Sequence, residues 1–407
     1  MNRTPLGSVR LLTLIIILVF AAIGISSPLI TLYLEELGAN YARISLILAS
    51  FAATLLLSPY VWGRISDRLG RRKVVLVGGL VGLALAYAWL SRVATVNAAW
   101  TARVLEGIGL AAYTTASLAL MGDLLGAEGR RGRRMGAYRG LGSLAFAAGA
   151  VAGGYLADRY SLRLTFDLCS ILYLLAVLCA LVLREAPSPA SASAPQIAGP
   201  DPDVSPEQPA PGNYALPLPF LGGVFLWVTA LASAAAMWPN YMARLGYSKT
   251  AISSLWGLSA LVEAPAMHLL GNFSDVAGRA PLLAGGGLGV AVVMVGYITL
   301  ARFLPALVGV QVVRGLAYAS YTATSMTFAV EWGEQSNRGS NTGLFNTATG
   351  GGQLLGLLLG GAIAQTLGFE ILFALCGAIA LLSALCFWLL HYQQHLLKRP
   401  LSNEGTT

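Results

Sequence analysis

Charged side chains are scarce in this sequence: Asp, Glu, Lys and Arg make up only 11% of its 407 residues, whereas 56% are hydrophobic. A soluble domain carries about 25% charged residues. Water therefore cannot be the solvent for most of this chain, and the soluble globular class is excluded. The net charge of +8 does not indicate nucleic acid as a partner, because the basic residues gather in short segments between apolar runs, which is the pattern of a membrane protein.

Residues for metal, redox or hydrolytic chemistry are also few. The four cysteines stand in apolar runs and form no C-x-x-C pair, so we interpret them as small packing residues. The three histidines are scattered, and the sequence has no Walker loop, no G-x-S-x-G and no H-E-x-x-H pattern. The sequence therefore predicts no metal, no cofactor and no enzyme, and any active process must use an ion gradient or substrate exchange.

What the sequence does contain is a series of long apolar runs. Each reaches the roughly 20 residues that cross about 30 Å of hydrocarbon as a helix, and unbroken runs of this length exclude barrel strands. The first run is too long for a signal peptide, although basic residues precede it. The expected spans are 9–34, 41–62, 74–95, 98–122, 135–157, 162–184, 217–242, 249–271, 281–301, 304–330, 340–366 and 369–391.

A segment of different composition divides these spans into six and six. Residues 186–213 are rich in Pro, Ala and Ser and have almost no large apolar residue, so we predict an extended, mobile linker. The predicted domains are an N-terminal six-helix bundle (1–185), this cytoplasmic linker (186–213), a C-terminal six-helix bundle (214–391) and a cytoplasmic tail (392–407).

The basic residues predict the orientation. If the N-terminus lies inside, the dense basic clusters all face the cytoplasm, as the positive-inside rule requires. These residues are Arg64, Arg68, Arg71, Arg72, Lys73, Arg130, Arg131, Arg133, Arg134, Arg184, Lys398 and Arg399. We therefore expect a multi-pass protein of the cell (plasma or inner) membrane, in contact with the lipid bilayer, with both termini cytoplasmic.

One charged stretch, residues 63–73, connects the second and third spans. Its spacing, G-x-x-x-D-R-x-G-R-R, closely resembles the signature loop of the major facilitator superfamily, and a degraded copy recurs with a constant offset of 208 residues at 271–279. The resemblance implies an all-α membrane protein with twelve transmembrane helices in two six-helix bundles, related by a parallel pseudo-twofold repeat. It also implies a substrate path between the bundles near the midplane. We expect a monomer.

The resemblance further implies a cytoplasmic gate. In the family this loop pairs with an acid at the end of span 4, where Asp123 stands, and with the start of span 11. We expect a charge latch in which Gly63 and Gly70 permit a tight turn; the alternative is that these charges only set topology. The second copy lacks the later arginines, so its latch should be weaker. The gate residues are Gly63, Asp67, Arg68, Gly70, Arg71, Arg72, Asp123, Asp275 and Arg279.

Span 4 carries Arg103 and Glu106 in a stretch that resembles the family's R-x-x-x-G-x-G motif, which is often tied to proton coupling. The two residues are three apart and share one helix face. A charge in hydrocarbon costs several kcal/mol, so both should face the bundle interior or pair. The repeat places Arg314 opposite Glu106, which suggests a pair between the bundles. The alternative is a static ion pair.

Glu263 is the lone acid of span 8 and falls near the middle of the bilayer. Desolvation favours the protonated form of a buried carboxyl that has no partner. Glu263 is therefore the best candidate for the proton carrier, or for a group that hydrogen-bonds to substrate. The alternative is a protonated structural carboxyl that satisfies the backbone opened by Pro265.

Polar and aromatic side chains in several spans are candidates for the substrate cavity. They are Ser26, Ser27, Tyr33, Tyr113, Trp227, Trp238, Asn240, Glu263, Tyr321, Asn346 and Gln353. Trp238 could instead anchor a helix at the membrane interface. Span 1 has no acidic residue and so offers no cation site there, which favours a neutral or anionic substrate.

Glycines recur in spans 5 and 11 and let helices approach closely. They are Gly149, Gly153, Gly154, Gly352, Gly356 and Gly360. Their spacing resembles the family's antiporter motif, although Ala150 and Leu357 replace its proline. The favoured function is proton-coupled efflux of a small organic solute, drug-like or sugar-like. The first alternative is a proton-coupled symporter that imports a sugar, nucleoside or aromatic acid. The second is a membrane sensor or scaffold that transports nothing.

Overall fold

The computed structural model describes residues 6–125, 131–183, 216–332 and 338–397. Within these ranges the chain forms thirteen helices and no strand. They are α1 (Leu6–Ser26), α2 (Ile30–Glu36), α3 (Tyr41–Leu69), α4 (Arg72–Leu90), α5 (Val96–Leu125), α6 (Arg131–Arg159), α7 (Leu162–Val182), α8 (Leu218–Arg244), α9 (Lys249–Ala277), α10 (Arg279–Thr299), α11 (Leu304–Glu331), α12 (Arg338–Thr366) and α13 (Phe369–Leu397). The predicted linker, 186–213, lies outside the described residues, and the start of the predicted tail is helical because α13 continues to Leu397.

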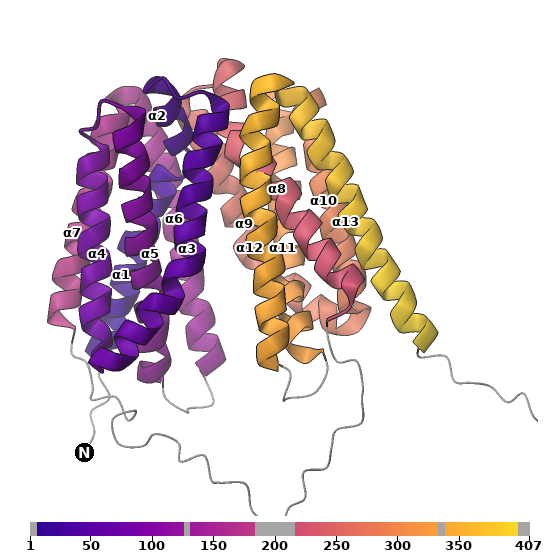
Figure 1. Ribbon diagram of the computed structural model, residues 1–407, viewed down its shortest axis with the longest axis horizontal. Coiled ribbons are helices and arrows are strands. Elements are labelled where there is room, and N and C mark those ends of the chain that lie inside the picture. Colours follow the sequence, from indigo (N-terminus) through magenta and orange to yellow (C-terminus); the bar gives the residue numbers. More distant parts are fainter. Residues whose placement is uncertain (1–5, 126–130, 184–215, 333–337, 398–407) are drawn as a thin grey trace, which may run out of the picture.

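The long helices form two bundles (Figure 1). In the first bundle α1 packs on α6 and α7, and α5 packs on α3 and α4. In the second bundle α8 packs on α12 and α13, and α11 packs on α9 and α10. These pairs correspond under the sequence repeat. The predicted architecture of two six-helix bundles is therefore confirmed.

The bundles contact each other mainly through two helix pairs, α6 with α9 and α3 with α12, and less extensively where α2 and α3 meet α8. Figure 1 shows the ribbons of the two bundles together near the end that carries α2, and further apart towards the end where α1 begins and α13 ends. We call these the α2 end and the terminal end.

Ten of the described helices are long and apolar enough to cross a membrane. Among the long helices, α9 and α11 fall outside this set. These two helices carry Glu263 and Arg314, so their lower hydropathy accompanies polar residues that face the protein interior, as described below.

The first predicted span is wrong as a single helix. The chain leaves the helix after Ser26 and resumes at Ile30, so the expected 9–34 helix is two helices, α1 and α2. Pro28 lies in the break, and proline has no N–H for an intrahelical bond and clashes with the preceding turn. The break places Ser27 at the end of α1 and turns α2 towards the second bundle, which it contacts through α8.

The predicted loop at 63–73 is also mostly helix. Helix α3 continues through Gly63 to Leu69, and only Gly70 and Arg71 separate it from α4. Gly70 has φ +60°, a left-handed conformation that glycine adopts without steric cost, so it ends the helix as predicted. Gly63 forms no turn, and the space beside its Cα is open. In the second copy, Gly278 also ends its helix, α9, at a positive φ of +86°, but its ψ of 157° lies outside the left-handed helical region.

The glycines of α6 and α12 lie at close helix crossings. A Cβ at Gly149 would overlap the carbonyl oxygen of Ala21 in α1. A Cβ at Gly356 would stand 2.5 Å from the carbonyl oxygen of Thr229 in α8. Because backbone lies against backbone at these crossings, neither helix can admit a side chain without moving. Gly149 and Gly356 thus lie where α1 crosses α6 and where α8 crosses α12.

This packing predicts a large difference between two glycines of the same helix. Gly149→Ala should destabilise the protein by about 1–3 kcal/mol, because the added methyl overpacks the α1–α6 crossing. Gly140→Ala should be neutral or slightly stabilising, because that position is open and alanine favours helix. Thermal unfolding of the purified protein in detergent measures both. Equal melting temperatures for the two variants would contradict the close crossing.

Candidate functional site

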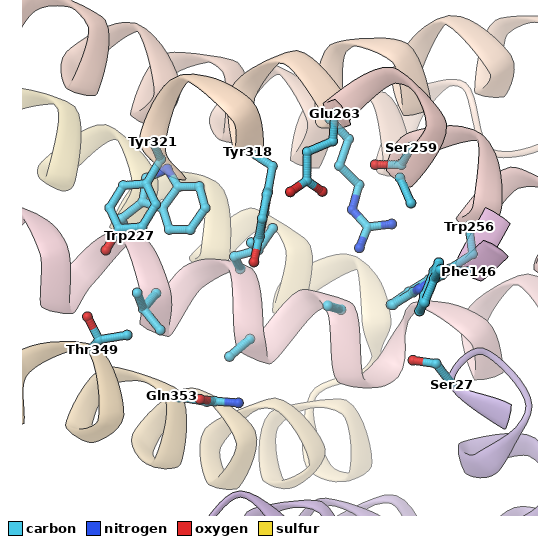
Figure 2. Close-up of a pocket in the computed structure, with 16 residues that line it drawn as sticks. Ser27, Phe146, Trp227, Trp256, Ser259, Glu263, Tyr318, Tyr321, Thr349 and Gln353 are labelled. Atoms are coloured by element: carbon cyan, nitrogen blue, oxygen red, sulfur yellow. The ribbon is translucent and has the colours of Figure 1, made fainter. Parts of the chain in front are cut away.

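A cavity of about 510 Å³ lies between the bundles, and most of its lining comes from the second bundle (Figure 2). Among the described residues, the first bundle contributes Ser27, which directly follows α1, and Phe146 of α6. The second bundle supplies side chains from α8, α9, α11 and α12: Trp227, Val228, Leu231, Ala232, Ala235, Trp256, Ser259, Ala260, Glu263, Arg314, Tyr318, Tyr321, Thr349 and Gln353. A volume of this order suits a small organic molecule.

The periodicity of each helix explains this lining. Helix α9 contributes Trp256, Ser259, Ala260 and Glu263, which are spaced i, i+3, i+4 and i+7 and therefore share one face. On α11, residues 314, 318 and 321 share a face in the same way. One face of each helix is thus polar or aromatic towards the cavity.

An aromatic cluster forms one wall of the cavity. The rings of Trp227 and Tyr321 are stacked, with centroids 3.7 Å apart and planes 6° from parallel, and Tyr318 lies 5.6 Å from Trp227. Figure 2 shows these three side chains together beside the cavity. The indole N–H of Trp227 is buried and has no hydrogen-bond partner in the part of the chain that the structure describes. The wall is therefore a flat apolar surface, and the buried indole N–H of Trp227 is a hydrogen-bond donor without a described acceptor.

Among the described residues that line the cavity, one is an acid and one is a base. The carboxylate of Glu263 is directed into the cavity (Figure 2), and no described residue forms a salt bridge with it. Arg314 is held from two sides: its guanidinium lies 4.2 Å from the centroid of Trp256, and its Nη1 lies 3.4 Å from Oε1 of Gln311. Pro265, two residues after Glu263, does not end the helix, because α9 continues to Ala277. Glu263 is thus positioned to exchange a proton or to bind a polar group of a substrate.

The second buried acid, Glu106, is arranged differently. Glu106 and Arg103 form an ion pair within α5, and their side chains are 7% and 6% exposed. The Tyr87 hydroxyl donates to Oε1 of Glu106 at 2.8 Å and lies 2.6 Å from the Ser26 hydroxyl. The Arg103 guanidinium also stacks 4.1 Å from the centroid of Phe51.

The expected pair between Glu106 and Arg314 is therefore not formed. Both groups already have partners inside their own bundles, Arg103 for the acid and Trp256 for the base. The i, i+3 spacing of Arg103 and Glu106 allows this local pair at no cost in backbone rearrangement.

The structure brings together only part of the predicted cavity set. Ser27, Trp227, Glu263, Tyr321 and Gln353 line the cavity. The other predicted residues do not line this cavity, so the prediction is wrong for them in this structure. Buried elsewhere are Ser26, Tyr33, Tyr113, Trp238 and Asn240, and Asn346 is exposed.

Two of these residues show why. The Tyr33 hydroxyl donates to the carbonyl of Leu90 at 2.9 Å, and Nδ2 of Asn240 donates to Oε2 of Glu35 at 2.6 Å. The polar groups of Tyr33 and Asn240 therefore form hydrogen bonds at the α2 end and not at the cavity.

Sequence reasoning missed Phe146, Trp256, Ser259, Tyr318 and Thr349. A helical signal was available for three of them, since Trp256 and Ser259 precede Glu263 by seven and four residues and Tyr318 precedes Tyr321 by three. Phe146 and Thr349 have no such signal, because only the packing of the bundles brings them to the cavity.

The gate residues occupy the terminal end, and three of their contacts can be stated. Nη1 of Arg72 donates to the carbonyl of Ala119 in α5 at 2.9 Å. Arg279, in the second copy, forms an ion pair with Glu331 of α11, with Nη2 2.6 Å from Oε1, and lies 3.8 Å from Asp275. The side chain of Asp123 lies outside the described residues, so its predicted pairing with Asp67 or Arg71 stays a prediction.

Comparisons with known proteins agree with this architecture. The family model of the Major Facilitator Superfamily matches residues 12–301 and 219–406. A Deinococcus radiodurans protein that is provisionally named a sugar efflux transporter is 28% identical over 378 residues, which cover 91% of this chain and 94% of that protein. The quinolone resistance protein NorA of Staphylococcus aureus is 24% identical over 179 residues, which cover 44% of this chain and 45% of NorA.

Solved structures show the same fold. The nucleoside transporter NupG (D323A mutant) superimposes with a TM-score of 0.79 at 14% identity, and the match covers 94% of this chain and 99% of that one. The peptide transporter POT in complex with sulfate gives a TM-score of 0.76 at 12% identity over 95% and 94% of the two chains. At these identities the likeness concerns the fold. Together with the family model, it shows that this chain belongs to the major facilitator superfamily and is a multi-pass membrane transporter.

Proposed function

We propose that this transporter exports a small polar organic solute, of the sugar class first, in exchange for protons, and that Glu263 carries the proton. The observation that supports this most directly is the carboxylate of Glu263, which faces the cavity and has no salt-bridge partner among the described residues. A carboxyl in low dielectric that is reachable from a cavity can gain and lose a proton as its access to water changes.

The relatives support the direction and the substrate class. The Deinococcus protein named for sugar efflux matches almost the whole chain, and NorA, named for quinolone resistance, matches nearly half. The cavity fits a polar ring: aromatic faces of Trp227, Trp256 and Tyr318 can cover its apolar side, while Glu263, Arg314 and Gln353 can bind hydroxyl groups. The terminal end faces the cytoplasm in this proposal, because the basic clusters lie there.

The test uses inside-out vesicles with an acidic lumen and a trapped pH dye. Glucose, lactose and a quinolone are added in turn outside, which is the cytoplasmic side. We expect the lumen to become more alkaline with a sugar, because substrate enters as protons leave. Further acidification would mean that substrate and proton move together, as in a symporter. No response to any compound, with no uptake of the radiolabelled sugars, would contradict sugar export. Vesicles without the protein provide the control.

A further inference from the structure

At the α2 end, an acid of the first bundle binds the first turn of a helix in the second. Oδ1 of Asp158, near the end of α6, accepts from the backbone N–H of Lys249 at 3.0 Å. Its Oδ2 accepts from the N–H of Thr250 at 2.8 Å and from the Thr250 hydroxyl at 2.6 Å. These are the first two residues of α9. One carboxylate thus makes three hydrogen bonds across the boundary between the bundles.

The first turn of α9 is prepared for such a contact. A helix leaves its first N–H groups without intrahelical partners. Ser248, the N-cap residue of α9, satisfies one of them by accepting from the N–H of Ala251 at 3.1 Å. The N–H groups of Lys249 and Thr250 remain, and they meet a negative charge at the positive end of the helix, where such a charge is favourable.

The repeat places a second contact of the same kind on the other side. Between α6 and α12 the offset of the repeat is 207 residues, as Gly154 and Gly361 show, so the position equivalent to Asp158 is Gln365 of α12. Oε1 of Gln365 accepts from the N–H of Tyr41, the first residue of α3, at 3.0 Å. The N-cap residue of α3, Asn40, accepts from the N–H of Arg43 at 2.9 Å, as Ser248 does in α9. Each bundle therefore caps a helix of the other, once with a charged side chain and once with a neutral one.

A glycine one turn earlier allows each of these crossings. A Cβ at Gly154 would stand 2.6 Å from the carbonyl oxygen of Lys249, and a Cβ at Gly361 would overlap the carbonyl oxygen of Tyr41. The adjacent glycines, Gly153 and Gly360, pack instead on α1 and α8 of their own bundles. In each Gly-Gly pair, the first glycine packs on a helix of its own bundle and the second packs on a helix of the other bundle.

We propose that Asp158 and Gln365 are a pseudo-symmetric pair of latches that hold the bundles together at the α2 end, and that Asp158 is the stronger of the two. Both contacts must break when the cavity opens at that end, because each joins an α6 or α12 helix to a helix of the other bundle. The difference in strength follows from chemistry: Asp158 has a charge and makes three hydrogen bonds, whereas Gln365 is neutral and makes one. This proposal needs no assignment of substrate, proton or direction.

The test measures from which side of the membrane the cavity can be reached. Ala235 lines the cavity, so Ala235→Cys, in a background with the native cysteines replaced by serine, reports access to a membrane-impermeant maleimide. Labelling is compared in right-side-out and inside-out vesicles. With Asp158 intact we expect labelling mainly from the side of the terminal end. Asp158→Asn should raise labelling from the other side about fivefold, the order expected for loss of a helix cap. Gln365→Glu should lower it.

A matched control comes from the same end of the molecule. Asp167 accepts from Nη1 of Arg92 at 3.0 Å, but both residues belong to the first bundle. Asp167→Asn should therefore leave the labelling ratio unchanged. Asp158→Ala guards against an effect peculiar to asparagine, and labelling from the terminal side, lowered only by the fraction that opens at the α2 end, verifies that each variant is folded. If Asp158→Asn and Asp158→Ala match Asp167→Asn, or if Gln365→Glu increases access at the α2 end, the latch proposal is wrong.

Discussion

Replacing Glu263 by glutamine is expected to abolish proton-driven transport while leaving the protein folded and able to bind its substrate. Glutamine keeps the shape and hydrogen-bonding capacity of a protonated carboxyl but cannot release a proton. Because Glu263 faces the cavity without a salt-bridge partner among the described residues, the substitution breaks no direct ion pair there, although it removes the negative charge that shares the cavity with Arg314. We expect pH-driven flux to fall at least about a hundredfold, the scale on which a positioned proton-transfer group contributes to a rate.

Two assays separate coupling from binding in this variant. Uptake driven by a pH gradient in proteoliposomes should be lost, whereas exchange of labelled for unlabelled substrate at equal concentration should persist, since exchange needs no net proton movement. Glu370→Gln is the matched control, because Glu370 is an exposed acid in the first turn of α13. Retention of gradient-driven uptake by Glu263→Gln would show that another group carries the proton.

The sequence determined the architecture well because hydropathy and the repeat are both long-range signals. Runs of apolar residues predicted the long helices, and the offset of 208 residues predicted two equivalent bundles. Local features were less reliable. Pro28 broke the first span into α1 and α2, and Gly63 stayed in a helix although glycine in a charged segment suggested a turn. At Pro28 one residue broke a continuous apolar run, whereas at Gly63 the helix continued through the glycine.

The candidate site was predictable only where a conspicuous residue marks one face of a helix, because the helical period then identifies the other residues of that face. Glu263 stood out as a lone acid, and its helical period would have led to Trp256 and Ser259. The asymmetry of the cavity could not be predicted, because it depends on how the bundles meet. The cavity is lined mainly by the second bundle, while the acid of the first bundle, Glu106, is neutralised by Arg103. Equivalent helices of the repeat thus carry charges with different environments.

That difference leads to the second large prediction, which concerns stability. Arg103→Met should destabilise the protein by about 3–5 kcal/mol, because it leaves the carboxylate of Glu106 buried without a cation. The side chains of both residues are less than a tenth exposed, so solvent screening is weak here. Thermal unfolding in detergent can be followed with a thiol-reactive dye, since Cys169 and Cys376 are buried and react when the fold opens.

The double variant Arg103→Met, Glu106→Gln should recover most of the lost stability, because it removes both charges and keeps a hydrogen-bonding partner for Tyr87. Arg92→Met is the control: it breaks an exposed ion pair with Asp167 and should cost about 0–1 kcal/mol. Equal melting temperatures for the single and double variants would mean that the buried pair does not set the stability of α5. The double variant also tests function, since a stable protein with intact coupling would make the pair structural. A stable protein without coupling would instead give Arg103 and Glu106 a part in proton transfer, beside Glu263.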